Sequence, residues 1–287
     1  MDIELVRTFL EVNRLRHFAR AAERLYVTPA AVSARVRLLE DHVGARLFTR
    51  NRNNIRLTAA GQRFLPHAEN MVRSWNRAML SVGSPGEQLE LVALGSLHSI
   101  WDVLLGGWLP QVYGQHSELV LQIDLLTSQA VVARVREQSL DLGLLYEPPR
   151  ASDLWVEPVA AVQLVLVSDR TGLGVGDELP DYVHVDWGLQ YAMALSKALP
   201  ELPDPALRVD SPEVAYEFLR SRGGTAYLPR LTVAPDLECR RLHLVGGAPV
   251  IERPVFLIES AESKASGAHA AVRDSLVAWF GSARDAA

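Results

Sequence analysis

The sequence predicts two parts of different structural class, a mainly α-helical N-terminal part that ends in one long helix and a larger α/β part. The chain has 287 residues, and at roughly 150 residues per domain this length allows two domains. Apolar residues recur at helical spacing over residues 1–80, which we call the head. From residue 89 onward, in the remainder that we call the body, strand and helix patterns alternate.

The charges divide between the same two parts. The head carries 14 arginines against 7 acidic residues, whereas residues 81–287 carry 15 basic against 27 acidic residues. A basic head on an acidic body favours a polyanionic partner for the head alone.

Several other classes are excluded by composition. The longest stretch without a charged residue, residues 103–117, is too short and too polar for a membrane span. No apolar run follows the first charged residues, as it would in a signal peptide. The single cysteine, Cys239, excludes an internal disulfide framework and a thiolate zinc cage, so an idle or buried thiol is expected. We therefore expect a cytoplasmic protein that does not contact membranes.

The head is predicted to begin with two short amphipathic helices within residues 2–26. The small side chains of Ala21 and Ala22 in the second helix allow another helix to cross closely. The apolar positions at helical spacing are Ile3, Val6 and Leu10 in the first helix and Phe18, Ala21, Ala22 and Leu25 in the second.

A third helix is predicted between Thr28 and Gly44. Thr28 is a favourable N-cap, and Pro29 fits the first helical position, where its missing N–H costs nothing. Its outward stripe is small, polar or basic, which suits a helix that lies in a DNA major groove, although a solvent-facing stripe has the same composition. The residues of this stripe are Ala30, Ser33, Ala34 and Arg37.

Residues 47–58 are predicted to form a β-hairpin. Ile55 and Leu57 alternate with Arg56 and Thr58, which gives one apolar and one basic face, and Asn53-Asn54 tolerates a tight turn. Arginines at a hairpin tip can hold phosphates, while the alternative is a solvated charged loop. Because the hairpin directly follows two crossing helices, we interpret the head as a winged helix-turn-helix.

The head resembles the LysR-type transcriptional regulators. The run from residue 52 to residue 61 is most similar to the HdfR branch of that family. The resemblance rests on the spacing of Leu5 and Phe9, Ala21-Ala22-x-x-Leu25, Thr28-Pro29-Ala30-Ala31-Val32-Ser33, Leu39-Glu40, Gly44, Leu47-Phe48-x-Arg50 and Leu57-Thr58-x-x-Gly61.

This resemblance implies a regulator that binds double-stranded promoter DNA. Pro29 replaces the Gln that most relatives carry, and its side chain donates no hydrogen bond, so the base preference of relatives does not transfer to this chain. The residues expected to contact DNA are Thr28, Pro29, Ala30, Ser33, Arg35, Arg37, Arg50, Arg52, Asn53 and Arg56.

A long connecting helix is predicted after Thr58, with Pro66 tightening or kinking its first turns and a hinge at residues 81–87. Its apolar positions approximate a heptad seam. They fit either a core helix of a single domain or, as the resemblance implies, a linker that forms a homodimer or homotetramer. The expected seam residues are Phe64, Met71, Trp75 and Met79.

The body is predicted to contain a parallel sheet, because a βαβαβ order opens it and a second set of elements follows. The terminal helix, residues 270–280, is expected to dock on the first set. The first set is a strand at 89–94, a helix after Ser99, a strand at 119–126, a helix at 129–138 and a strand at 140–146. The second set is strands at 163–168, 182–185 and 223–229, a helix at 214–221 and a return strand at 254–259.

This order fits the two-lobed, periplasmic-binding-protein-like effector domain of the same family. The predicted domains are 1–58 for DNA binding, 59–86 for the linker, and 87–287 for the effector. In the last of these, lobe 1 covers about 87–161 and 261–287 and lobe 2 about 162–260.

A small-molecule effector is expected between the lobes, at the carboxyl ends of strands. A helix opened by Ser99 favours a carboxylate or similar small anion. Each candidate is alternatively a helix cap or a core-edge residue. The candidates are Ser96, His98, Ser99, Thr127, Ser128, Asp186, Trp187 and Tyr227.

No catalytic constellation is recognisable, so no enzyme activity, cofactor or metal is expected. The eight histidines form no metal-ligand spacing, and neither a nucleophile elbow nor a phosphate-binding loop occurs. The glycines at 172, 174 and 176 indicate a turn. The alternative hypothesis is a binding-protein-like enzyme or transport component with a fused basic head.

Overall fold

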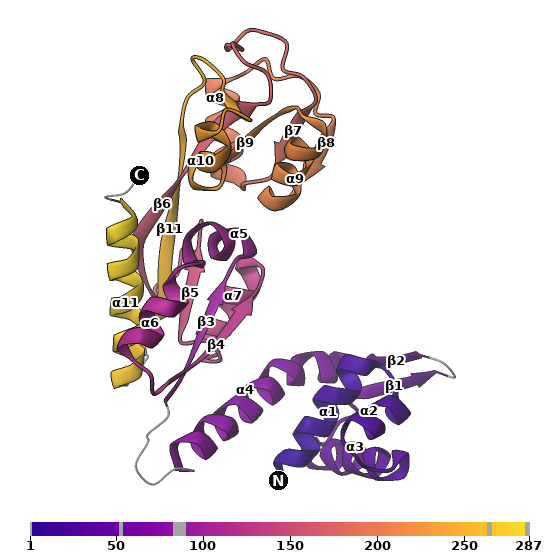
Figure 1. Ribbon diagram of the computed structural model, residues 1–287. Coiled ribbons are helices and arrows are strands. Elements are labelled where there is room, and N and C mark those ends of the chain that lie inside the picture. Colours follow the sequence, from indigo (N-terminus) through magenta and orange to yellow (C-terminus); the bar gives the residue numbers. More distant parts are fainter. Residues whose placement is uncertain (1, 52–53, 83–89, 263–265, 285–287) are drawn as a thin grey trace. The chain divides into compact units, whose positions relative to one another are not determined.

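The computed structural model describes residues 2–51, 54–82, 90–262 and 266–284 (Figure 1). Contacts between Cα atoms divide the chain into two compact units. The first comprises residues 1–93, 118–122 and 133–141, and the second comprises residues 94–117, 123–132 and 142–287.

The head contains the three helices, the hairpin and the long helix that the sequence predicts. The helices and strands predicted from the spacing of apolar residues in the head are therefore confirmed. The elements are α1 (Ile3–Leu15), α2 (Phe18–Arg24), α3 (Pro29–Val43), β1 (Phe48–Asn51), β2 (Asn54–Leu57) and α4 (Ala59–Val82). Asn51 pairs with Asn54, so only Asn53 of the predicted Asn-Asn turn lies between the strands, at a position outside the described residues.

One apolar core holds these elements together. Phe9 of α1 is fully buried, and its ring centroid lies 5.2 Å from that of Phe48 and 5.3 Å from that of Phe64. Ala21 and Ala22 are buried where α2 packs on the other helices, as their small size predicts. Phe64, which was expected in an intermolecular seam, instead packs into this core because α4 begins directly against α1.

Both predicted ends of α3 are confirmed. The Thr28 hydroxyl accepts a hydrogen bond from the backbone N–H of Ala31 (3.2 Å), and Pro29 occupies the first turn. Gly44 ends the helix in the left-handed conformation, with φ of 73°. The helix is therefore fixed at both ends by local sequence alone.

A buried carboxylate joins the end of α3 to the start of the hairpin. Glu40 is buried and accepts hydrogen bonds from the backbone N–H groups of Leu47 (2.8 Å) and Phe48 (3.2 Å) and from Arg46 Nη1 (2.7 Å). Burial by itself raises the pKa of Glu40, but these three donors outweigh it and hold the pKa below its ordinary value. The carboxylate thus fixes the direction in which the hairpin leaves α3.

The long helix starts directly after Thr58, as predicted, and the Thr58 hydroxyl caps it by accepting a hydrogen bond from the Gly61 N–H (2.9 Å). A Cβ atom on Gly61 would lie only 2.2 Å from the Leu47 carbonyl oxygen, so only glycine allows this close approach. α4 continues as one helix through Pro66. Residues 83–87 of the predicted hinge lie outside the described residues.

The strands of the body form a single mixed sheet. β3 and β5 pair in parallel, which confirms the predicted βαβαβ order. The strands lie in the order β4-β3-β5-β11-β6-β9-β7-β8, with β10 added to β6. They are β3 (Glu90–Ser96), β4 (Leu119–Leu125), β5 (Leu142–Leu145), β6 (Leu154–Ser168), β7 (Tyr182–Val185), β8 (Leu207–Val209), β9 (Thr225–Pro229), β10 (His243–Leu244) and β11 (Ile251–Ser260).

The centre of this sheet is the long antiparallel pair of β6 and β11, which Figure 1 shows running between the two groups of shorter strands. The pairing extends from Leu154 opposite Ser260 to Leu164 opposite Ile251, with an irregularity between Val255 and Phe256. The sequence predicts only the last six residues of β6. The first half of β6 is not predicted, because Pro158 argues against a strand there. The strand tolerates Pro158 because this residue lies at the irregularity.

The helices of the body differ from prediction mainly at the start of the first lobe. The helix expected to open at Ser99 begins at His98, with Leu97 at the N-cap, and continues as a π-helical turn. α8, α10, β8 and β10 are not predicted, since α8 has no side-chain cap and Pro235 lies inside α10. The helices are α5 (His98–Ile100), the π-helical turn (Trp101–Leu105), α6 (Trp108–Gln115), α7 (Ser128–Arg136), α8 (Leu189–Ala198), α9 (Pro212–Arg222), α10 (Arg230–Glu238) and α11 (Gly267–Arg284).

The terminal helix α11 docks as predicted. Trp108 Nε1 donates a hydrogen bond to Ser275 Oγ (3.1 Å), and Trp279 Nε1 donates one to the Leu104 carbonyl (2.6 Å).

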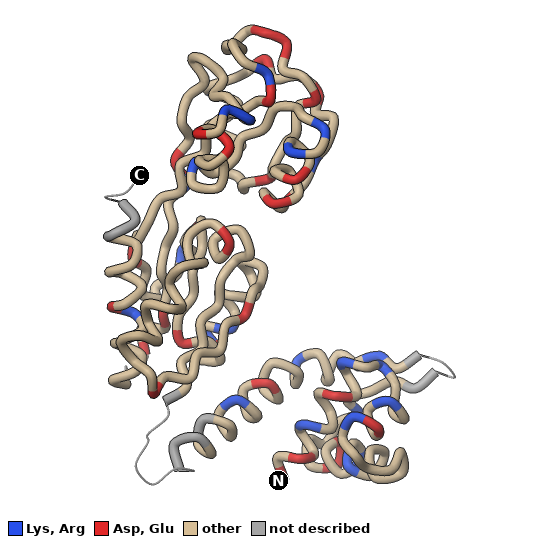
Figure 2. The backbone as a smooth tube through the Cα atoms, in the orientation of Figure 1, with Lys and Arg blue, Asp and Glu red and all other residues tan. Residues whose placement is uncertain are grey.

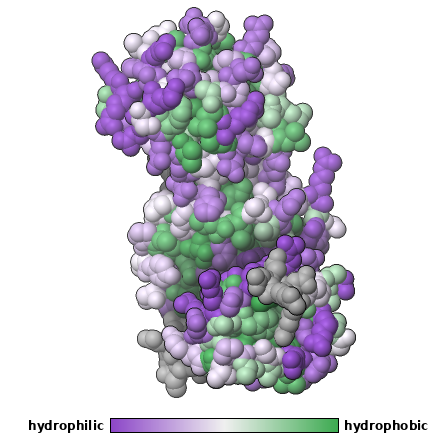
Figure 3. Space-filling view, turned by 90° about the vertical axis from the view of Figure 1, so that its right-hand side faces the viewer, coloured by the Kyte–Doolittle hydropathy of each residue, from purple (hydrophilic) through white to green (hydrophobic). Residues whose placement is uncertain are grey.

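Within the described residues, no helix is long and apolar enough to cross a membrane. On the face drawn in Figure 3, hydrophilic side chains separate the hydrophobic patches.

Replacing Glu40 by Gln should destabilise the head by about 1–3 kcal/mol at pH 7, because the amide loses the charge that strengthens three hydrogen bonds. Since the pKa of Glu40 is lowered by folding, this stabilisation is present above the unfolded pKa of about 4.3 and is lost as the pH falls through the folded pKa. Hydrogen exchange of the Leu47 and Phe48 amides at pH 7 and in acid measures the effect. The exposed neighbour Asp41→Asn is the control, and a Glu40→Gln effect of the same size at both pH values would contradict the prediction.

Candidate nucleic-acid interface and ligand site

The outward face of α3 carries the predicted small residues. Pro29, Ala30, Ala34 and Arg37 are exposed, and Ser33 is half-buried. Arg37 is the single long cationic side chain on this stripe. Thr28 is also exposed at the start of the helix, where its hydroxyl is already engaged as the N-cap. A backbone with so little side-chain bulk can approach a groove closely.

Arg35 does not lie on this face. Its Nη1 donates a hydrogen bond to Thr8 Oγ1 (3.4 Å) and lies 3.8 Å from Glu4 Oε2, so the side chain is directed toward α1. Five residues after Ala30, at 100° per residue, Arg35 also projects from a different side of α3. The structure therefore separates Arg35 from the other predicted residues of α3.

The hairpin has the predicted apolar and basic faces where it is described. Ile55 and Leu57 pack on the core of the head, while Arg56 is exposed. Arg52 and Asn53, and the side chain of Arg50, lie outside the described residues. Figure 2 shows basic positions on all the helices of the head and on β2, with acidic positions between them.

Tyr26 is a surface feature that the sequence analysis did not single out. It lies in the turn between α2 and α3, its side chain is 95% exposed, and its φ is 54°. A left-handed conformation is unusual for an aromatic residue, and it holds the ring out of the core. In the sequence, the feature that could have pointed to Tyr26 is an aromatic residue between two apolar residues in the turn that joins the two helices.

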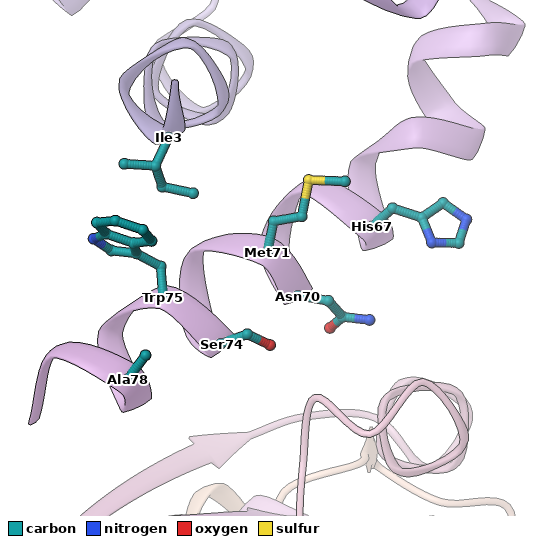
Figure 4. A pocket seen from close by; sticks show the side chains of 7 residues that line it. All are labelled: Ile3, His67, Asn70, Met71, Ser74, Trp75 and Ala78. Atoms are coloured by element: carbon teal, nitrogen blue, oxygen red, sulfur yellow. The ribbon is translucent and has the colours of Figure 1, made fainter. Parts of the chain in front are cut away.

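The second half of α4 exposes an apolar strip. Met71, Trp75 and Met79 are 38%, 46% and 55% exposed. Figure 4 shows Met71 and Trp75 beside Ile3 of α1, where they line an open pocket with more polar neighbours. These large apolar side chains leave a contiguous apolar surface along one helix.

In the first lobe, the ends of β3 and β4 meet as predicted, because the Leu126 N–H donates to the Ser96 carbonyl (2.9 Å). Ser96 itself is fully buried, and its hydroxyl donates to the Leu97 carbonyl (3.1 Å). Thr127 is exposed, and its hydroxyl accepts from the Ala130 N–H (3.4 Å) as a cap of α7. Next to these strand ends, His98 and Ser128 are exposed and Ser99 is half-buried.

Two of the predicted ligand contacts in the second lobe are core residues instead. Trp187 is buried, with its Nε1 donating to the Tyr227 carbonyl (3.3 Å). Tyr227 is also buried, and its hydroxyl donates to the Pro249 carbonyl (3.0 Å). Burial raises the pKa of Tyr227 to about 12, and the neighbouring Tyr182 adds to the effect. Both polar atoms are satisfied internally, and both rings belong to the core of the lobe. Asp186 is exposed.

A cluster around Arg253 was not predicted. Arg253 is 2% exposed on β11, and its guanidinium lies 4.9 Å from the ring centroid of Tyr146 and 3.6 Å from Glu147 Oε1. Burial lowers the pKa of Arg253, while Glu147, Tyr146 and Asp186 act in the opposite direction. Burial raises the pKa of Tyr146 to about 12, although Ser99 and Arg253 lower it. In the sequence, the feature that could have pointed to Arg253 is the alternation of the strand. This alternation places Arg253 on the buried side together with Ile251 and Val255.

Acidic groups flank the same region. Burial raises the pKa of Asp102, and the nearby carboxylate of Glu213 raises it further, while His98 lowers it. Glu213 accepts a hydrogen bond from the Ser211 hydroxyl (2.7 Å) at the start of α9. Within the described residues, no group of three or more potential ligand side chains is placed to hold a metal ion.

A helix-turn-helix with a basic hairpin, joined through a long helix to a two-lobed α/β body, defines a DNA-binding regulator with a small-molecule-binding domain. Residues 3–62 match the family described as "Bacterial regulatory helix-turn-helix protein, lysR family", and residues 85–281 match "LysR substrate binding domain". The chain belongs to the LysR family of transcriptional regulators, and it is not an enzyme.

Similar proteins agree with this assignment. The HTH-type transcriptional regulator HdfR of Yersinia enterocolitica is 37% identical over 273 residues, which cover 90% of each chain. Among solved structures, CbnR, a LysR family transcriptional regulator, superimposes with a TM-score of 0.77 at 17% identity over 98% of this chain and 99% of that one. Full-length CbnR complexed with its target DNA gives a TM-score of 0.73 at 18% identity over the same shares. These structures share the fold.

Replacing Tyr227 by Phe should lower the free energy of unfolding by about 1 kcal/mol, because the Pro249 carbonyl loses its buried hydrogen-bond donor. Urea unfolding of the full chain checks this, with the exposed Tyr113→Phe as the control that should change nothing. An unchanged stability of the Tyr227 variant would contradict a core role.

Proposed function

We propose that the regulator docks α3 in the major groove of promoter DNA. The observation that carries this proposal is the exposed stripe of Pro29, Ala30, Ala34 and Arg37 on a helix capped at both ends. The stripe leaves the backbone free to approach base edges and leaves Arg37 as the side chain that reaches them. Pro29, in place of an amide side chain, predicts a base preference that differs from that of relatives with Gln.

The hairpin and the turn before α3 then contact the DNA backbone. Arg50, Arg52, Asn53 and Arg56 are proposed to hold phosphates on one side of the groove. The Tyr26 hydroxyl is proposed to reach a phosphate from the exposed turn. Thr28 and Ser33 add hydroxyl groups beside the stripe. Arg35 is the weakest member of the proposed set, because it is held by Glu4 and Thr8.

Two copies are proposed to associate through the apolar strip of α4, Met71, Trp75 and Met79, into a homodimer or a homotetramer. Trp75 lies beside Ile3 of α1 on this surface (Figure 4). Paired heads present two recognition helices to two half-sites, which a dimeric regulator requires.

The body is proposed to bind a small effector between the two lobes, in the cytoplasm. His98, Ser99, Thr127, Ser128 and Asp186 remain exposed or half-buried near the strand ends. Ser96 is enclosed. The domain limits that go with this proposal are 1–58, 59–86 and 87–287, with the lobes meeting near residues 161 and 261. Closure of the lobes would rotate the linkers and change the spacing or bending of bound DNA.

Arg37→Ala should weaken binding to a DNA site selected from a random pool by about 1–3 kcal/mol, and should weaken binding to unselected DNA less, if Arg37 contacts a base. Arg56→Ala should weaken both alike and reduce the salt slope by about one. Anisotropy titrations at several salt concentrations separate the two roles. Arg170→Ala removes the same charge from an exposed position of the body and serves as the control. Unchanged affinity of Arg56→Ala would contradict the phosphate contact.

Trp75→Glu should dissociate the dimer, because it places an unpaired charge in an apolar contact at a cost of several kcal/mol. Gln62→Glu adds the same charge to an exposed position in the first turns of α4 and should leave assembly unchanged. Sedimentation velocity at several protein concentrations distinguishes them. A Trp75→Glu variant that sediments like the wild type would place the interface elsewhere.

A further inference from the structure

Arg253 is a buried cation whose hydrogen-bonding capacity is only partly used. It is 2% exposed, and neither Nε nor Nη1 has a hydrogen-bond partner among the described residues. A guanidinium stays charged at neutral pH and presents five N–H donors in a planar fork. Burying such donors without acceptors costs free energy, so this position favours an additional oxygen ligand.

The N-terminus of α8 is directed toward the same point. This ten-residue helix begins after Gly188, and the N-cap glycine has no side chain that could accept a hydrogen bond from the first turn. The Gln190 N–H in its first turn donates to Glu147 Oε1 at 3.4 Å, the same oxygen that lies 3.6 Å from Arg253 Nη1. Backbone amides at a helix N-terminus attract anions. Arg253 and the first turn of α8 therefore both face the Glu147 carboxylate.

Glu147 occupies this position loosely. Both distances exceed the 2.7–2.9 Å that is typical of charge-assisted hydrogen bonds, and the Glu147 side chain is 41% exposed. A carboxylate held by long contacts beside solvent is easily displaced.

Gly188 leaves the room that an anion at this point needs. Its φ is 90°, and a Cβ atom there would lie 2.9 Å from Glu147 Oε1 and 3.2 Å from Arg253 Nη2. A larger residue would fill the space between the guanidinium and the helix N-terminus. Glycine therefore keeps this space open to a carboxylate.

We propose that Arg253 and the first turn of α8 form the subsite for a carboxylate of the effector, and that Glu147 is an internal competitor that occupies it when no effector is bound. This inference rests on the effector-binding part of the proposed function and places the anion in the second lobe, not at Ser99.

The surrounding charges restrict the class of ligand. Exchange of Glu147 for a ligand carboxylate keeps one anion beside one guanidinium, which preserves the charge balance of the buried site. Asp186, whose carboxylate accepts from the Gly188 N–H (2.9 Å), and the acidic pair of Asp102 and Glu213 repel a second negative charge. The subsite thus favours small monocarboxylates over dicarboxylates.

The test compares full-length wild type with Glu147→Gln, using acetate and benzoate as monocarboxylates and succinate as the dicarboxylate, at constant ionic strength. Calorimetric titration should show that Glu147→Gln binds acetate or benzoate about tenfold more tightly, because the competing charge is gone, and succinate less tightly than either. Glu252→Gln removes the same charge from an exposed neighbour of Arg253 and should behave as wild type. Arg253→Lys in the Glu147→Gln background should abolish the gain, because lysine lacks the planar fork.

Equal affinities of Glu147→Gln and Glu252→Gln would overturn the inference, as would a gain that survives Arg253→Lys. DNA binding of the same proteins is measured in parallel. If all of them bind DNA and the affinity for carboxylates does not change, only the subsite is wrong. If the wild type does not bind DNA, the proposed function is wrong.

Discussion

The body depends on the antiparallel pairing of β6 with β11. Every other strand of the sheet lies to one side of this pair or the other, in the order β4-β3-β5 and β9-β7-β8, apart from β10, which pairs with β6. The pair also carries Arg253, which β11 presents at the point where Glu147 and Gly188 approach. Under the proposed subsite, a bound carboxylate would contact the strands that join the two groups, and this pair would couple ligand binding to lobe geometry.

In the head, the corresponding constraint is the carboxylate of Glu40. The short helices cannot by themselves fix where the hairpin points, because a four-residue strand pair has little core of its own. Glu40 solves this by accepting from Leu47 and Phe48, where α3 ends and β1 begins. A single buried acid thus links α3 to the hairpin within an otherwise basic part of the chain.

The two sites illustrate how charge is used differently in the two parts. On α3 and the hairpin, Arg37 and Arg56 are exposed, where cations can exchange solvent counterions for phosphates. In the body, Arg253 is buried, with its guanidinium over the Tyr146 ring and 3.6 Å from the Glu147 carboxylate. Exposed cations give affinity that depends on salt, whereas a buried cation discriminates among ligands by their charge and shape.

The sequence by itself determined the local elements whose signals lie within a few residues. The Thr28 cap and Pro29 start of α3, the alternation of Ile55 and Leu57, and the parallel βαβαβ order are examples, and the spacing over the head was enough to indicate the family. Only the tertiary structure decided which side chains face a site. Trp187 and Tyr227 proved to be core residues and Arg35 an internal contact, while Arg253, Glu147 and the start of α8 came together from distant segments. The physical reason is that capping and periodicity are local, whereas burial and charge pairing depend on which strands become neighbours in space.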